Sequence, residues 1–208
     1  AKAFAWDIFL FGAEEDSGDA NLSGLSSKNA FSSPDGLWFS KATGICWIQT
    51  DDGAFTDETN CMMLAAIPGQ VGDGGKVTVK NKMVVNGVEQ TGTQETFLGA
   101  ALGDAKLRRF LVAPLGAEVT GITETADGRT LFVNIQHPGE LSKPLAASAP
   151  PQSAWPGNQG YGNPGRPRSA TIVITRKDGG VIGLYRNEFG CPMQVLTWPR
   201  RSAWPFFQ

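Results

Sequence analysis

Acidic side chains of this sequence gather where apolar, strand-like runs meet loops. Hard cations such as calcium prefer several oxygen ligands, and carboxylates held on rigid turns supply them. Iron accepts carboxylate, imidazole and thiolate ligands. The residues of this kind at such junctions are Asp35, Asp51, Asp52, Glu118, His137 and Glu140. Their chemistry is that of a metal site, provided that the fold brings several of them together.

Each of these residues also has an ordinary structural explanation. Asp35 lies in a Ser-Pro-Asp-Gly turn, where aspartate commonly bonds its own backbone. Asp51 and Asp52 are typical of solvated strand ends, and Glu118 is typical of a solvated acid before a strand. His137 precedes Pro138-Gly139 and could simply end a strand. These alternatives stay open on the pattern alone.

The motifs of several familiar enzyme classes are absent. The sequence has one histidine and no Gly-x-Ser-x-Gly, so a nucleophile elbow is missing. It also has no His-Glu-x-x-His or P-loop motif. Arg108 and Arg109 could clamp a phosphate, although neighbours on a strand point to opposite faces and at most one can serve a given site. A solvated strand edge is the alternative for this pair.

The elements that position these residues are expected to be strands. Gly and Pro number 26 and 13, charged residues make up 18%, and many short apolar runs lie between the turns. This composition favours an all-β fold. An Asp127-Gly128 turn between β-branched runs predicts a hairpin. We expect strands over residues 4–11, 37–39, 44–50, 61–67, 108–114, 118–123, 130–136, 170–175 and 181–184, a hairpin-like surface segment over 76–85, and long loops over 13–29 and 141–168.

An internal repeat favours a propeller over other all-β folds. Two sequence units can be aligned with each other at a spacing of about 85 residues. The first is Gly36-Leu37-Trp38-Phe39 with Trp47-Ile48-Gln49, and the second is Gly121-Ile122-Thr123-Glu124 with Phe132-Val133-Asn134. Half of that spacing is close to the ~40–45 residues of a propeller blade. We therefore expect residues 1–185 to be part of a β-propeller, about three blades' worth of antiparallel strands with long loops, and leave 186–208 as an unassigned tail. A β-sandwich is the alternative.

The net charge and the apolar runs of the sequence limit the classes of molecule that the protein is expected to bind. The net charge is −2 with no basic stripe, which argues against nucleic-acid binding. No apolar run approaches the ~20 residues that span a bilayer, and no signal peptide is evident.

Three cysteines show no zinc spacing, and Cys46 beside Trp47 is expected to be a buried thiol. The apolar run over residues 4–11 is typical of the middle of a strand, so we expect a truncated chain.

Four stretches together resemble the C-terminal part of PhoX-type alkaline phosphatases. They occur in the family's order, cover roughly residues 4 to 183, and are more specific in combination than singly. The four are Trp6-Asp7-Ile8-Phe9-Leu10; Ser33-Pro34-Asp35-Gly36-Leu37 with Trp47-Ile48-Gln49-Thr50-Asp51; Gly116-Ala117-Glu118-Val119-Thr120-Gly121 with 127–140 (DGRTLFVNIQHPGE); and Pro167-Arg168-Ser169-Ala170-Thr171 with 178–183 (DGGVIG).

The resemblance implies a much longer parent protein that folds as a six-bladed propeller and hydrolyses phosphate monoesters. It implies calcium and iron near the propeller axis, with an iron-ligating cysteine upstream of any region matched here. Carried over by position, Asp35 and Glu118 are the expected metal ligands. His137 is a third candidate, expected to contact the ligands more than the metal itself. The implied chemistry is metal-assisted hydrolysis, in which cations polarise the phosphoryl group.

The same resemblance implies a periplasmic or secreted protein, and the missing N-terminal part of the same protein is a possible partner. A different function class stays open beside it. A partial propeller leaves an open sheet edge whose unpaired backbone groups invite pairing with another chain. The alternative to a phosphatase portion is therefore a non-catalytic β-module that associates through such an edge.

Overall fold

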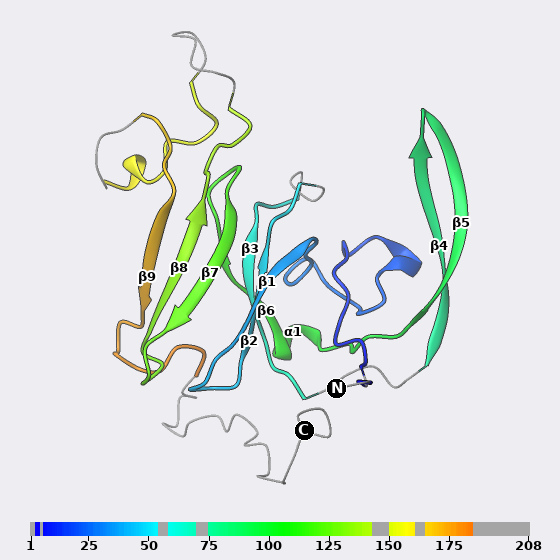
Figure 1. Ribbon diagram of the computed structural model, residues 1–208, viewed down its shortest axis with the longest axis horizontal. Helices are drawn as coiled ribbons and strands as arrows, with labels where there is room; N and C mark the ends of the chain where they lie inside the picture. The colour runs from blue at the N-terminus through cyan, green and yellow to red at the C-terminus, as the bar shows by residue number, and fades with distance from the viewer. Residues whose placement is uncertain are drawn as a thin grey trace.

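The computed structural model describes residues 3–4, 6–53, 58–69, 75–142, 150–160 and 165–184. Within these ranges the regular structure is almost entirely strand, arranged as three antiparallel sheets (Figure 1). The expectation of an all-β fold is therefore confirmed. The tail assigned to 186–208 lies outside the described residues.

The first sheet has four strands, in the order β1-β2-β3-β6. Its two central strands are buried on both faces, because apolar residues occupy odd and even positions alike. Cys46 and Ile48 enter one core, whereas Trp47 between them enters another. The buried thiol predicted at Cys46 is confirmed, and burial raises its pKa to about 12. The strands are β1 (Pro34–Phe39), β2 (Cys46–Thr50), β3 (Met62–Ala66) and β6 (Leu107–Val112).

The second sheet has three strands, in the order β7-β8-β9, and packs against one face of the first (Figure 1). Val119, Val133 and Ile135 project from it into the core that contains Trp47. The hairpin predicted at Asp127-Gly128 joins the first two strands, as expected. The strands are β7 (Glu118–Glu124), β8 (Thr130–Gln136) and β9 (Ala170–Thr175).

The predicted repeat corresponds to the first hairpin of each of these sheets. The register of β1 on β2 shifts between Pro34 and Gly36, and that of β7 on β8 shifts between Thr120 and Ile122. The bulge falls at Asp35, directly before Gly36, in the first hairpin and at Gly121 in the second, so both lie at or beside the glycine that the two sequence units share. Gly121 has φ +53°, and the side-chain amide of Asn134 occupies the space that a Cβ would fill.

The third sheet is a hairpin that stands apart from the other two in Figure 1. It consists of β4 (Lys76–Val85) and β5 (Val88–Phe97), paired over their full length. The hairpin-like segment expected over 76–85 is thus a single strand. Its partner β5 was not predicted, because Val88–Phe97 is mostly polar and lacks apolar alternation.

The N-terminal segment covers the other face of the first sheet. Phe9 and Leu10 pack against the core there, together with the buried Phe31. Residues 6–12 are not a strand, in contrast to the expectation over 4–11; a lone bridge joins Ala13 to Phe31. Residues 181–184, also expected to be a strand, form a turn that buries Ile182.

Helical structure is limited to three short pieces among the described residues. No helix there combines the length and the apolar character needed to pass through a bilayer. The pieces are η1 (Gly18–Ala20), α1 (Gly103–Lys106) and η2 (Gly157–Gln159).

One carboxylate ties the two packed sheets together at the end opposite to the candidate ligands. Glu124, the last residue of β7, accepts hydrogen bonds from the Ser40 hydroxyl at 2.8 Å and the Lys41 backbone N–H at 2.6 Å. The Ala42 N–H also points at it, at 3.3 Å. The turn between β1 and β2 is thereby anchored to the second sheet.

We predict that Glu124→Ala lowers the free energy of unfolding by about 2 kcal/mol, because hydrogen bonds to a charged group are lost and the turn donors are left unpaired. Chemical denaturation measures this. The control is Glu95→Ala, which removes the exposed ion pair with Lys76 and should cost under about 1 kcal/mol. Equal losses for the two variants would contradict the anchoring role.

Candidate metal site

Three side chains from different strands converge at one end of the packed sheets. One ligand atom of each of Asp51, Glu118 and His137 lies within 4.8 Å of the others. Asp51 follows β2, Glu118 begins β7 and His137 follows β8. Two of the three predicted ligands, Glu118 and His137, are therefore brought together, and a second acid, Asp51, joins them.

The sheet register explains this convergence. Glu118 pairs with Gln136 across the β7–β8 ladder, so the residue that follows β8 lies beside the start of β7. The end of β2 reaches the same place because β2 packs against β7. Each candidate ligand is thus positioned by strand pairing or by the core between the sheets, rather than by a free loop.

His137 is held in an unusual backbone conformation. Its φ is +36°, a region that non-glycine residues rarely adopt. Its backbone N–H donates to the Ser169 hydroxyl at 2.9 Å, which fixes the turn. Strain of this kind persists where surrounding contacts hold it, and it is concentrated at functional sites.

The imidazole has defined surroundings on both nitrogens. Nδ1 lies 3.4 Å from the Gly116 carbonyl and 3.7 Å from a Glu140 carboxylate oxygen. Nε2 lies 3.4 Å from Oε2 of Glu118. With the proton on Nδ1, directed at these acceptors, the lone pair on Nε2 faces the site. This is the arrangement in which histidine binds a metal.

The charges of the group favour a bound cation. Glu118 is buried, being 7% exposed, and its carboxylate lies close to that of the exposed Asp51. Two carboxylates this close repel each other, and burial adds a desolvation penalty to the inner one. A bound cation would relieve both costs. Two oxygen donors and one nitrogen donor fit iron, and the carboxylates fit calcium.

A buried amide lies near the end of β2, close in sequence to Asp51. Gln49 is 2% exposed, and among the described residues its Nε2 has no hydrogen-bond partner. It precedes Asp51 by two positions, so both side chains start from the same face of β2. A Cβ on Gly36 would lie 2.6 Å from its Oε1, so a glycine there leaves room for the amide. Sequence reasoning missed Gln49, because glutamine inside a strand carries no motif.

The remaining predicted acids have different surroundings. Asp35 is exposed, in the bulge of β1 opposite the end of β2, and is not one of the three converging residues. Its role as a ligand stays a prediction. Asp52 accepts hydrogen bonds from Ser32 and Ser33, and its N–H donates to Cys61 Sγ at 3.1 Å. Asp52 therefore stabilises the turn before β1.

Neither arginine of β6 approaches this group. Arg109 donates to the Ala30 carbonyl at 3.1 Å, on the face covered by the N-terminal segment. Arg108 donates to the Asp104 carbonyl at 2.9 Å. A phosphate clamp from this pair is therefore not supplied at the Glu118 site.

Comparison with known proteins gives two matches. The sequence model of a family described as alkaline phosphatase PhoX matches residues 1–139. A solved structure, Pseudomonas fluorescens PhoX in complex with vanadate, a transition state analogue, matches with a TM-score of 0.51 and 32% identity. The match covers 83% of this chain and 23% of that one, so the chain spans about a quarter of that relative's length. No curated protein matches.

We predict that Glu118→Gln weakens calcium binding at least ~10-fold, because it removes the charge of the buried ligand while keeping the shape of the side chain. Isothermal titration of the metal-free protein measures the affinity. The matched control is Glu89→Gln on the exposed β5 strand, which should leave the affinity unchanged. Equal calcium affinity in the Glu118 variant and the unmodified protein would exclude Glu118 as a ligand.

Proposed function

The chain belongs to the PhoX alkaline phosphatase family, and from this premise we propose that it forms part of a metal-dependent phosphate monoester hydrolase. The observation that carries the proposal is the convergence of Asp51, Glu118 and His137 at one end of two packed sheets. Family membership rests on the match over residues 1–139. The catalytic activity and the identity of the ester belong to the proposal.

The two packed sheets would be neighbouring blades of a propeller. Three features support this arrangement: antiparallel meanders in sequence order, face-to-face packing, and a bulged first hairpin in each sheet. In a ring of such sheets, residues at equivalent strand ends gather around the axis. The candidate ligands come from strand ends of both sheets, as that geometry requires.

Calcium and iron are the proposed cofactors. When bound, such cations polarise a phosphoryl group and stabilise the charge that develops during its transfer. Asp51 and Glu118 would hold the cations through their carboxylates. His137 would bind through Nε2, with its orientation fixed by the Gly116 carbonyl. Asp35, exposed on β1, would add a ligand from the rim of the site.

Gln49 has a separate proposed role in the same site. Its Nε2 is a buried hydrogen-bond donor without a partner among the described residues, and Asp51 follows two positions later on the same strand face. It would donate to a carboxylate of the site or to an oxygen of the phosphate. In a dry site such a donor is worth more than in water, because no solvent competes for it.

A non-catalytic β-module is the second candidate. It is favoured by the sheet edges, because within the described part β1 and β9 each pair on one side only. Val173 on β9 is 61% exposed, so the outer face there also offers apolar surface. Pairing with another chain, including another part of the same protein, would cover this edge. Export to the periplasm or the medium is proposed from the family resemblance alone.

We predict that the full-length natural polypeptide hydrolyses 4-nitrophenyl phosphate and that exhaustive chelation abolishes this activity. Glu118→Gln should lower kcat/KM at least ~100-fold, because it removes a ligand that stabilises charge in the transition state. Steady-state kinetics with and without added calcium and iron measure both effects. Full activity after chelation would contradict the proposal of a metal-dependent phosphatase. A protein that contains no metal and has no activity would favour the non-catalytic β-module.

A further inference from the structure

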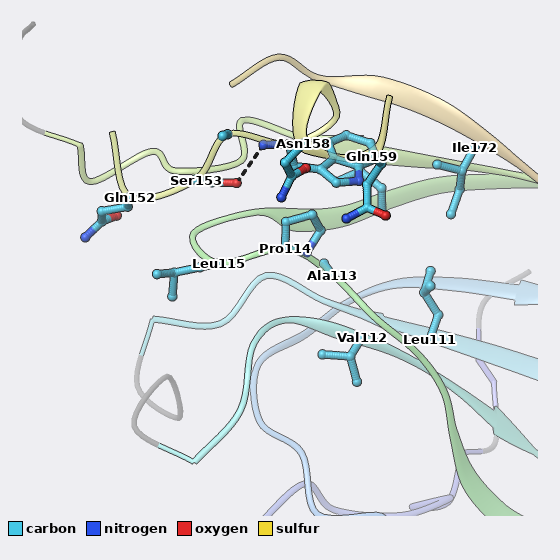
Figure 2. A pocket seen from close by; sticks show the side chains of 13 residues that line it. Leu111, Val112, Ala113, Pro114, Leu115, Gln152, Ser153, Asn158, Gln159 and Ile172 are labelled. Atoms are coloured by element: carbon cyan, nitrogen blue, oxygen red, sulfur yellow. Dashed lines mark hydrogen bonds between the residues drawn. The ribbon is translucent and has the colours of Figure 1, made fainter. Parts of the chain in front are cut away.

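A groove lies beside the candidate metal site, between the edge strand β6, strands β8 and β9 and the loop over residues 152–159 (Figure 2). Its volume is about 550 Å³, within the ~300–1,000 Å³ typical of small-molecule sites. All of its lining residues are uncharged. They are Leu111, Val112, Ala113, Pro114, Leu115, Ile135, Gln152, Ser153, Ala154, Trp155, Asn158, Gln159 and Ile172.

The lining divides into an apolar floor and a polar rim. Leu111 and Ile172 reach toward one another from the two sheets in Figure 2, and Trp155 also lines the groove. The rim consists of amides, including Gln152 and Gln159, that are exposed. Within the described part of the chain the side chains of these amides form no hydrogen bond, so they are free to bind a ligand.

The groove and the metal site share a wall of backbone. Leu115, a lining residue, accepts a hydrogen bond from the Gly139 N–H at 2.8 Å. The next residue, Gly116, accepts one from the Glu140 N–H at 3.2 Å, and its carbonyl lies 3.4 Å from Nδ1 of His137. A single turn therefore separates the floor of the groove from the imidazole.

We propose that this groove binds the organic part of the phosphate monoester, an uncharged alcohol that carries a flat ring with polar edges. The proposal rests on the function proposed above, because it places the phosphate at the Glu118 site. An apolar floor with an aromatic side chain suits the faces of a ring, and rim amides suit its polar edge. The phosphate itself belongs outside the groove, since no cationic side chain lines it.

The test uses the full-length natural polypeptide with its metals, and 4-methylumbelliferone as the probe. This alcohol is fluorescent and is studied at a pH below the pKa of its phenol, where it is uncharged. Gln159→Trp fills the groove from its exposed rim, and Gln90→Trp makes the same change on the exposed β5 strand. Binding should weaken at least ~10-fold in the first variant and stay unchanged in the second. Absence of binding, or equal weakening in both, overturns the proposal.

A kinetic experiment distinguishes failure of the groove proposal from failure of the proposed phosphatase activity. The ratio of kcat/KM for 4-methylumbelliferyl phosphate to that for methyl phosphate should fall about 10-fold in Gln159→Trp, because methyl phosphate has no ring to place there. An unchanged ratio with both esters hydrolysed overturns the groove and leaves the phosphatase intact. If neither ester is hydrolysed while Gln159→Trp still weakens alcohol binding, the proposed function fails and the groove stands as an alcohol site.

Discussion

The structure depends on the apolar core between its two packed sheets. Trp47 from one sheet meets Val119 and Val133 from the other, all of them almost completely buried. Burial of such side chains stabilises each by about 1.5–3 kcal/mol relative to exposure. This core fixes the separation of the sheets, and therefore the place where their strands end. The candidate metal site exists because β2 and β8 end, and β7 begins, at the same end of this core.

Several features of the candidate metal site lower the folding stability that this core provides. The site places a buried carboxylate next to a second acid, leaves a buried amide without a partner, and holds His137 at positive φ. Each of these features costs folding free energy unless a ligand compensates it. A cation with an anionic ligand would turn two of the three costs into favourable contacts, because the cation would compensate the carboxylates and the anion would offer the amide an acceptor. The concentration of such features at one place favours a binding role over a purely structural one.

Sequence reasoning recovered most strands of the two packed sheets, because strong apolar runs and the Asp127-Gly128 turn mark them. It missed β5, whose polar residues show no alternation. It also assigned a strand to residues 4–11, of which residues 6–11 instead cover a core as irregular chain. Of the site, Glu118 and His137 came from the family resemblance. Asp51 was seen only as a strand-end acid, since its approach to Glu118 depends on packing between residues 67 positions apart, which no local pattern encodes.

The most direct test of the account locates the metals themselves. Anomalous X-ray diffraction from crystals of the full-length natural polypeptide, collected on either side of the iron absorption edge and with calcium present, places each ion. The account predicts an ion within about 2.5 Å of a Glu118 carboxylate oxygen, with Nε2 of His137 turned toward it. An ion-free site in which Glu118 and His137 pair with each other, while metals bind elsewhere, would contradict it.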